Sequence, residues 1–254
     1  MTLSDDDRRT LEDSGYVLVR GLVAPERVGA ALAAINSSLG RNGLPPDALP
    51  RMRAHTFCPE LVGDAAILDL YRATPMAALA EAALGSGRVR TPHDAQIALV
   101  FPTPDAGRAP PRPHIDGLPR AQNGVAAGTI YHFTALAAVF LSDAAVPFSG
   151  NFTVWPGSHR ALAAHFASNG AASLARPDTP FPPVPLPEPP RQLTVTAGDA
   201  LLAHYLLAHS VSANLGPHIR YAVFFRLFDD AHDAASTEAL ADLWRGWHGL
   251  AKLR

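Results

Sequence analysis

The sequence predicts an α+β fold, mainly β, in which a helical amino-terminal region precedes many short strands. Apolar residues recur at helical spacing over residues 25–40 and again over 64–84. From about residue 89 onward, short runs of β-branched and aromatic residues alternate with turns rich in glycine and proline. A chain of 254 residues with 48% hydrophobic residues is long enough to bury a sizeable core.

The helical region begins with a recognisable capping pattern. Ser4 is a good N-cap residue, Asp7 stands three positions later, and Gly15 is a plausible stop. We expect a strand over 16–22, a helix from Pro25 to Gly40 and a proline-rich connection over 41–57. Two helices are expected within 64–84. They divide at Thr74-Pro75, where threonine caps the second helix, and the second helix ends at Gly85.

The remaining elements follow from the same signals. Strands are expected near 96–101, 129–141, 151–155, 192–196, 200–207, 209–213 and 218–228. Ser158 is expected to cap a helix that runs to about Phe166, and Ser236 another that runs to about Arg245. Residues 177–190 contain eight prolines, so they are interpreted as a stiff surface insertion.

Composition excludes several classes of partner. The net charge is −2 and no dense lysine or arginine run occurs, which argues against nucleic acid and against an anionic membrane surface. Cys58 is the only cysteine, so an intrachain disulfide is impossible and a reducing cytoplasm is expected. We see no signal-peptide pattern and no apolar run approaching the ~20 residues that cross a bilayer. We expect a cytoplasmic protein that is a monomer or a homodimer.

His114 and Asp116 form a candidate metal-binding pair. Residues two positions apart on a strand point to the same face, so this imidazole and carboxylate can reach one ion. His209 completes a set of two histidines and one carboxylate, which suits ferrous iron and leaves coordination positions open. The pair alone is a weak signal, since a chain with 11 histidines and 23 acidic residues contains such pairs by chance.

Arg220 is a candidate carboxylate-binding residue. It follows His209 by 11 positions, enough for a turn and a return strand. Its planar guanidinium matches a carboxylate with two parallel hydrogen bonds. It shares a strand face with Ala222 and Phe224, and an arginine buried there needs a partner. That partner is either the carboxylate of a cosubstrate or an aspartate of the chain.

Five motifs occur in a fixed order along the chain. They are His114-x-Asp116, Trp155-Pro156-Gly157-Ser158-His159, Ala197-Gly198-Asp199-Ala200-Leu201-Leu202, His209 with Asn214, and Arg220. This order resembles the phytanoyl-CoA dioxygenase (PhyH) family of Fe(II)/2-oxoglutarate-dependent oxygenases. The stretch from Leu11 to Val23 is also similar to the start of that family. The resemblance therefore runs from about residue 5 to 228.

The resemblance implies a double-stranded β-helix, a cupin-like jelly roll, with amino-terminal helices packed on one sheet. It implies a single domain over 1–254, divided into a helical segment over 1–88, a jelly-roll core over 89–230 with the insertion 177–190, and a carboxy-terminal helix in 231–254. It further implies that His114, Asp116 and His209 bind Fe(II), that Arg220 and Gln96 bind 2-oxoglutarate, and that O2 is consumed with release of succinate and CO2.

Several other residues are candidates for ligand contacts, and each also has an ordinary structural interpretation. The resembled pattern favours His209 over His204 as third ligand, and makes His204 a packed or supporting histidine. Gln96 is otherwise an ordinary edge-strand glutamine. Tyr131 and His132 are candidate substrate or cosubstrate contacts, although a core aromatic is the better interpretation of Tyr131. Arg108 and Arg112 are candidate contacts for an anionic substrate on a loop that otherwise is simply solvated. We expect no catalytic acid or base.

We therefore predict an oxygenase that hydroxylates a small-molecule metabolite. Desaturation, cyclisation and epimerisation are alternative outcomes of the same chemistry. Asp116 stands where related halogenases have a small residue, so halogenation is not expected. We see no basic patch for the phosphates of coenzyme A, so an acyl-CoA substrate is not supported. A non-catalytic metal-binding jelly roll, acting as a sensor or binding module, is the alternative from another class, and only the oxygenase needs Arg220 near the metal.

Overall fold

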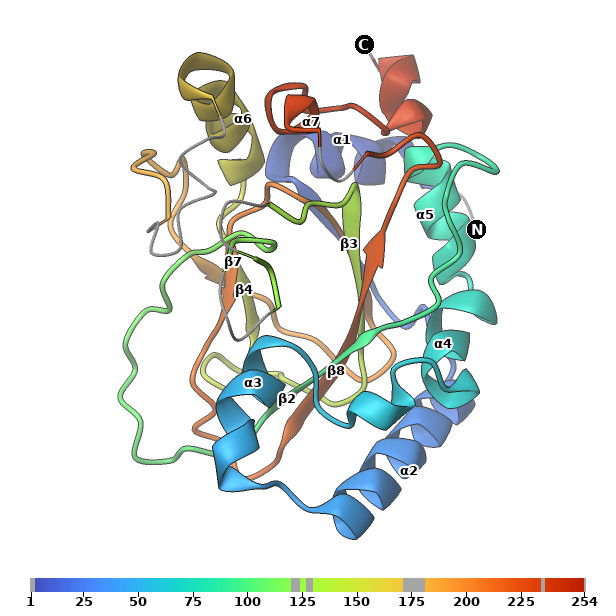
Figure 1. Ribbon diagram of the computed structural model, residues 1–254, viewed down its shortest axis with the longest axis vertical. Helices are drawn as coiled ribbons and strands as arrows, with labels where there is room; N and C mark the ends of the chain where they lie inside the picture. Colours follow the sequence, from blue (N-terminus) through green and yellow to red (C-terminus); the bar gives the residue numbers. More distant parts are fainter. Residues whose placement is uncertain (1–2, 120–123, 127–129, 171–180, 234–235, 254) are drawn as a thin grey trace.

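Two antiparallel β-sheets pack against each other in the computed structural model, which describes residues 3–119, 124–126, 130–170, 181–233 and 236–253 (Figure 1). The larger sheet has the strand order β1 (Tyr16–Val19), β6 (Ala200–His204), β3 (Ala135–Phe140), β8 (Arg220–Leu227) and β2 (Gln96–Val100). The smaller sheet has the order β5 (Arg191–Gln192), β4 (Phe152–Val154) and β7 (His209–Val211). All the pairings are antiparallel.

Helices flank the larger sheet. They are α1 (Asp5–Ser14), α2 (Pro25–Asn42), α3 (Leu49–Ala54), α4 (Ala65–Arg72), α5 (Met76–Leu84), α6 (Ser158–Asn169) and α7 (Glu238–Ala241), with short 3-10 turns at Pro46–Ala48, Pro59–Leu61 and His248–Leu253. Figure 1 shows α2, α4 and α5 on one side of β3 and β8, and strands β4 and β7 on the other. Among the helices described, none combines the length and the apolar character needed to cross a membrane.

Both faces of the larger sheet are therefore covered. Successive residues of β3 alternate between two apolar clusters: Val139 packs on the helix side with residues of α2, α4 and α5, whereas Ala138 packs on the side of the smaller sheet. Because side chains alternate along a strand, burial of both faces produces a continuous apolar sequence. The segment Ala135–Phe140 is buried throughout. The prediction of a mixed fold of helices and antiparallel sheet is confirmed.

The capping box predicted at Ser4 is present. The Ser4 hydroxyl accepts from the Asp7 backbone N–H at 3.1 Å, and the Asp7 carboxylate accepts from the Ser4 N–H at 3.1 Å. Gly15 ends the helix with φ +82°, a conformation that costs glycine little. The chain then enters β1 directly, so the capped helix fixes where the first strand joins the larger sheet.

Some predicted elements were wrong in position or length. The connection over 41–57 contains helix α3, because Pro46 and Pro50 lie in first helical turns, where no backbone donor is needed. The strand predicted over 129–141 begins only at Ala135, and residue 129 lies outside the described residues. Ser158 is not a cap: Gly157 holds that position, and the Ser158 hydroxyl accepts from the Ala208 N–H at 2.9 Å.

Two further expectations concern the end of the chain. The helix predicted from Ser236 to Arg245 is limited to Glu238–Ala241, because the residues after it turn so that Trp244 and Trp247 pack on His204. Of the predicted insertion 177–190, the described residues 181–190 contain neither helix nor strand, and 177–180 lie outside the described residues. Tertiary packing thus overrides the helical periodicity near the carboxyl end.

Two buried histidines tie these segments together. The His204 ring stacks on Trp247 at 5.3 Å between centroids, its Nδ1 accepts from the Leu206 N–H, and its Nε2 contacts the Leu243 carbonyl. The His159 ring contacts the Glu12 carbonyl at 3.0 Å. Burial lowers the pKa of His159 to about 4, and burial together with His159 lowers the pKa of His204 to about 3. His204 is the packed histidine that the sequence predicts.

Acidification should destabilise the fold through these two histidines. An unfolded histidine has a pKa near 6.5, so below that pH the unfolded state binds protons that the folded state refuses. The free energy of unfolding should therefore level off above about pH 7.5 and be lower by about 2 kcal/mol per histidine at pH 5. Urea denaturation at pH 7, 6 and 5 measures this slope.

The variants His204→Gln and His159→Gln should each flatten the pH dependence, whereas His55→Gln, on the exposed end of α3, should leave it unchanged. An equal slope in the wild-type protein and in both core variants would contradict the assignment.

Candidate functional site

A β-bridge brings His114 and His209 together. The His114 N–H donates to the His209 carbonyl at 3.0 Å, and the His209 N–H donates to the His114 carbonyl at 2.9 Å. Side chains of two directly opposed residues project to the same side of the pairing. The two imidazole rings accordingly lie 4.5 Å apart between centroids. The loop that carries His114 is thus fixed on strand β7 by its own backbone.

Asp116 joins this pair from two positions further along the loop. Its Oδ1 lies 3.5 Å from Nε2 of His209 and 3.9 Å from Nε2 of His114, and the three potential ligand atoms all lie within 4.8 Å of one another. Adjacent ligands of an octahedral ion at about 2.1 Å are about 3 Å apart, so small side-chain adjustments close the site. Two imidazoles and one carboxylate are the donor set expected for ferrous iron.

The hydrogen bonds of His209 leave one ring nitrogen available to a metal. Its Nδ1 lies 2.9 Å from the Leu207 carbonyl, which can only accept, so the proton is assigned to Nδ1. Nε2 then carries the lone pair and faces Asp116. The ring stacks on Phe152 with 5.2 Å between centroids, which fixes its orientation.

Asp116 is held as a charged carboxylate. Burial raises the pKa of this group, but nearby positive charge, chiefly the Arg226 guanidinium, outweighs burial and holds the pKa well below its usual range. Arg226 Nη2 lies 3.0 Å from Oδ2, and the Tyr205 hydroxyl donates to the Asp116 backbone carbonyl at 3.0 Å. The acid is therefore ionised and restrained before any ligand arrives.

Gly117, directly after Asp116, has no room for a side chain. Its φ is +78°, and an added Cβ would lie 1.7 Å from the carbonyl oxygen of Tyr131. The Tyr131 N–H donates to the Gly117 carbonyl at 3.0 Å, so the two segments are in direct backbone contact. Glycine is required here for this approach as well as for the backbone conformation.

Arg220 is buried with one nitrogen unsatisfied. Nε donates to the Gly150 carbonyl at 2.8 Å and Nη1 to the Ala98 carbonyl at 3.3 Å, whereas Nη2 is buried without a hydrogen-bond partner. Burial lowers the pKa of this guanidinium to about 10. No ion pair to an aspartate is found for Arg220 among the described residues, so the predicted alternative of an internal salt bridge is absent there. A buried donor of this kind indicates a site for an anionic group.

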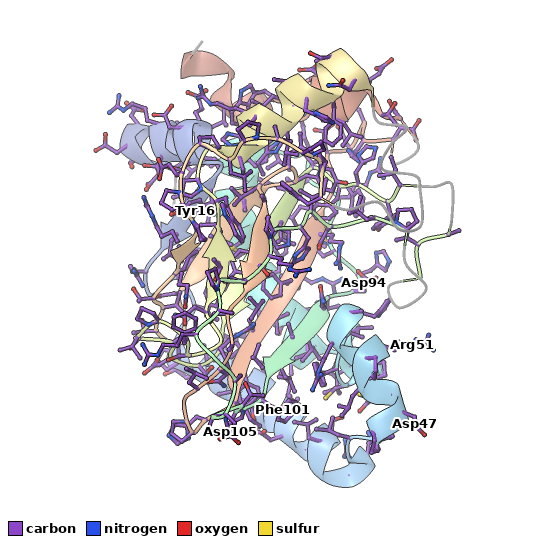
Figure 2. All side chains as sticks on the ribbon, turned by 90° about the vertical axis from the view of Figure 1, so that its left-hand side faces the viewer. Tyr16, Asp47, Arg51, Asp94, Phe101 and Asp105 are labelled. Atoms are coloured by element: carbon purple, nitrogen blue, oxygen red, sulfur yellow. The ribbon has the colours of Figure 1, made fainter. Side chains whose placement is uncertain are left out.

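One cavity of about 560 Å³ is lined by His114, Asp116, His209 and Arg220. This volume is typical of small-molecule sites. Gln96 and Arg226 contribute polar groups, and most of the remaining wall is apolar, with Leu136 and Phe224 between the sheets. Figure 2 shows strand β2 running from near Asp94 to Phe101, with helix α3 beside this edge of the sheet. Arg53 and Ala54 at the end of α3 complete the wall.

The other predicted contacts lie outside this wall. Tyr131 is 43% exposed, and its ring packs against Phe228. His132 is buried against Tyr205 and His232, and its Nε2 contacts the Ser236 carbonyl. The guanidinium of Arg108 lies 5.6 Å from the Phe148 ring, and Arg112 is exposed. None of these four predicted contacts, Tyr131, His132, Arg108 and Arg112, lines the described cavity, whereas Gln96 does.

Sequence reasoning missed Arg226. It lies six positions after Arg220 on β8, so the two arginines share a strand face. That spacing was a usable signal, since a second arginine on the face of the first also enters the cavity. The spacing alone does not predict that Arg226 pairs with Asp116, which lies on a loop far away in the sequence.

The chain matches the family model for phytanoyl-CoA dioxygenase (PhyH) over residues 11–222. No curated protein matches it. Among solved structures, the epimerase SnoN from nogalamycin biosynthesis is 23% identical with a TM-score of 0.61, over 89% of this chain and 80% of that one. HygX from Streptomyces hygroscopicus, solved with nickel and 2-oxoglutarate, is 18% identical with a TM-score of 0.56, over 92% and 90%. EctD from S. alaskensis, solved with 2-oxoglutarate and 5-hydroxyectoine, is 18% identical with a TM-score of 0.55, over 89% and 76%.

The likeness to these structures shows a shared fold, and the family match covers most of the chain. Together with the converging histidines and carboxylate, the match identifies the class of enzyme. The chain belongs to the phytanoyl-CoA dioxygenase (PhyH) family of oxidoreductases, whose cofactors are iron(II), 2-oxoglutarate and O2.

Proposed function

We propose that this chain is an Fe(II)- and 2-oxoglutarate-dependent dioxygenase that hydroxylates a small-molecule metabolite, with formation of succinate and CO2. One observation carries the proposal: a cluster of two imidazoles and one carboxylate shares a cavity with a buried guanidinium that has an unsatisfied donor. The metal cluster alone fits many functions. The additional cation fits a dianionic cosubstrate that bridges the metal and the arginine.

Each residue has a role in this proposal. His114, Asp116 and His209 would hold the iron, a donor set that leaves room for the cosubstrate and oxygen. Arg220 binds the far carboxylate of 2-oxoglutarate through Nη2, and Gln96 supplies a further polar contact. Iron and 2-oxoglutarate supply the oxidising chemistry when bound. The chain binds and orients them, and the apolar wall around Phe152 keeps water from the reacting groups.

We propose that the two sheets form a double-stranded β-helix with the amino-terminal helices packed on its larger sheet. The shared apolar cluster of α2, α4 and α5 with β3 and β8 supports this arrangement. We also propose one domain over 1–254, acting as a monomer or homodimer. The single Cys58, which is buried and free, fits a cytoplasmic location.

Hydroxylation of a small molecule is favoured by the size and apolar wall of the cavity. Similar structures were solved with small molecules, including SnoN with nogalamycin RO and HygX with hygromycin B. They also include an epimerase and the carbocyclase SnoK, so epimerisation and cyclisation are the alternative outcomes. Product mass separates these: hydroxylation adds one oxygen atom, epimerisation leaves the mass unchanged, and cyclisation by oxidation removes two hydrogen atoms.

Anaerobic titration of the protein with iron(II) and then 2-oxoglutarate should produce the visible charge-transfer absorption of the metal-bound keto acid. The Asp116→Ala variant should lose this absorption and all succinate formation in oxygen, because two histidines alone hold iron weakly. Circular dichroism and thermal melting check that the variant stays folded. Retained turnover in folded Asp116→Ala would refute the assigned ligand, and no absorption in the wild-type protein would refute the proposed function.

Arg220→Ala should weaken 2-oxoglutarate binding by at least about 30-fold, since loss of one partner of a buried charge pair costs about 2 kcal/mol or more. Calorimetric titration of 2-oxoglutarate into Mn(II)-loaded protein measures the affinity without turnover. Arg220→Lys should recover some of the loss, because it keeps the charge but not the two-pronged geometry. The control Arg41→Ala, at the exposed end of α2, should bind normally. Unchanged affinity in Arg220→Ala would contradict the role.

A further inference from the structure

Arg226 contacts two cavity residues through one nitrogen. Its Nη2 donates to Oδ2 of Asp116 at 3.0 Å and to Oε1 of Gln96 at 3.1 Å. These two acceptors come from different regions of the chain, one from the loop that carries the metal ligands and the other from the start of strand β2. Arg226 itself is on β8, which pairs directly with β2. It therefore joins the metal centre to the edge of the larger sheet.

The guanidinium is held in place on its other side. Its central carbon lies 5.7 Å from the centre of the Phe133 ring, a cation–π arrangement. Phe133 in turn packs edge-to-face on Tyr205, with 4.8 Å between centroids, and the Tyr205 hydroxyl donates to the Asp116 backbone carbonyl. Both the backbone and the carboxylate of Asp116 are thus restrained by one connected group of side chains, Arg226, Phe133 and Tyr205.

The first consequence concerns the coordination available from Asp116. Oδ2 is engaged by Arg226, whereas Oδ1 is the oxygen that lies near Nε2 of both His114 and His209. A carboxylate held in this way offers one oxygen to an ion. A free carboxylate can rotate, offer both oxygens, or leave the site. Arg226 therefore selects a single-oxygen ligand and keeps a further metal position open.

The second consequence concerns the direction of the Gln96 amide. Because Arg226 carries only donors, the atom of Gln96 that faces it must be the oxygen. The amide nitrogen is then the atom left to donate to another group. Gln96 lines the cavity, so this nitrogen is available to an oxygen atom of a ligand there. Arg226 therefore orients both the carboxylate of Asp116 and the side-chain amide of Gln96.

We propose that Arg226 is a positioning residue that presents Asp116 to the metal through Oδ1 alone and presents the amide nitrogen of Gln96 to an oxygen of the bound cosubstrate. This role rests on the proposed function. It assigns Arg226 no contact with the reacting atoms. Two effects of the residue oppose each other, which makes the role measurable: its positive charge repels a cation, whereas its hydrogen bond prepares the ligand that binds the cation.

Mn(II) binding to the protein, without cosubstrate, tests the first half of the role. Arg226→Met should weaken Mn(II) binding by about 10- to 100-fold, as is typical when a supporting partner of a metal ligand is removed. Arg226→Lys should lose less, because an ammonium still pairs with Oδ2. Arg51→Met, on α3 at the outer surface in Figure 2, is the matched control and should bind as the wild type does.

The sign of the change decides between charge and position. Removing a positive charge alone tightens cation binding, so tighter or unchanged Mn(II) binding in folded Arg226→Met would overturn the positioning role. If Arg226→Met fails to fold, Arg226→Lys carries the test, and an affinity equal to or above that of the wild type overturns the role. Absence of Mn(II) binding in the wild-type chain would overturn the proposed function and this role with it, so the two failures are distinguishable.

The second half of the role is tested with 2-oxoglutarate at saturating Mn(II). Gln96→Leu should weaken 2-oxoglutarate binding by about tenfold, the value of one hydrogen bond to a charged group, and should lower Mn(II) affinity less than Arg226→Met does. Arg226→Met should weaken both. Unaltered 2-oxoglutarate binding in Gln96→Leu would overturn the assignment of the amide nitrogen as a donor to the cosubstrate.

Discussion

The proposed metal centre depends on two backbone hydrogen bonds between residues 114 and 209. They set the distance between the imidazoles without help from either side chain. His114 lies outside the named strands, so this pairing with β7 is one of the contacts that hold it at the cavity. Asp116 lies in the turn that follows, where the Tyr205 hydroxyl holds its backbone carbonyl and Arg226 holds its carboxylate. The backbone pairing therefore places the two histidines, and side-chain contacts place the carboxylate.

The cavity combines a compensated charge pair with an uncompensated cation. Asp116 and Arg226 neutralise each other, and each is further restrained by neighbours. Among the described residues, Arg220 bonds to backbone carbonyls, and one of its nitrogens has no hydrogen-bond partner there. Burying an unpaired guanidinium is costly, and the sheet and helix cores around it must offset that cost. A ligand of opposite charge would neutralise the guanidinium and remove this cost. The difference between the two arginines therefore suits Arg226 to a structural role and Arg220 to ligand binding.

Much of this arrangement could be predicted from local patterns. The cap at Ser4 follows from a short-range rule. His114 and Asp116 converge as predicted, although Asp116 reaches His114 from a turn and not along a strand. The packed position of His204 was implied by the family resemblance. The fold around them required the family resemblance. Arg226 was missed because its contacts depend on the register between β2 and β8 and on the path of a distant loop. Helix α3 was missed because proline near a helix start resembles proline in a connection.

The contact between Gly117 and Tyr131 constrains the two positions very differently. Only the backbone of Tyr131 participates in that contact, and its side chain is 43% exposed, with the ring against Phe228. A library of variants can therefore explore every amino acid at position 131 except proline. Proline lacks the backbone N–H that donates to the Gly117 carbonyl. Position 117 tolerates no such diversity, since any side chain there collides with the main chain of the neighbouring segment, directly beside Asp116.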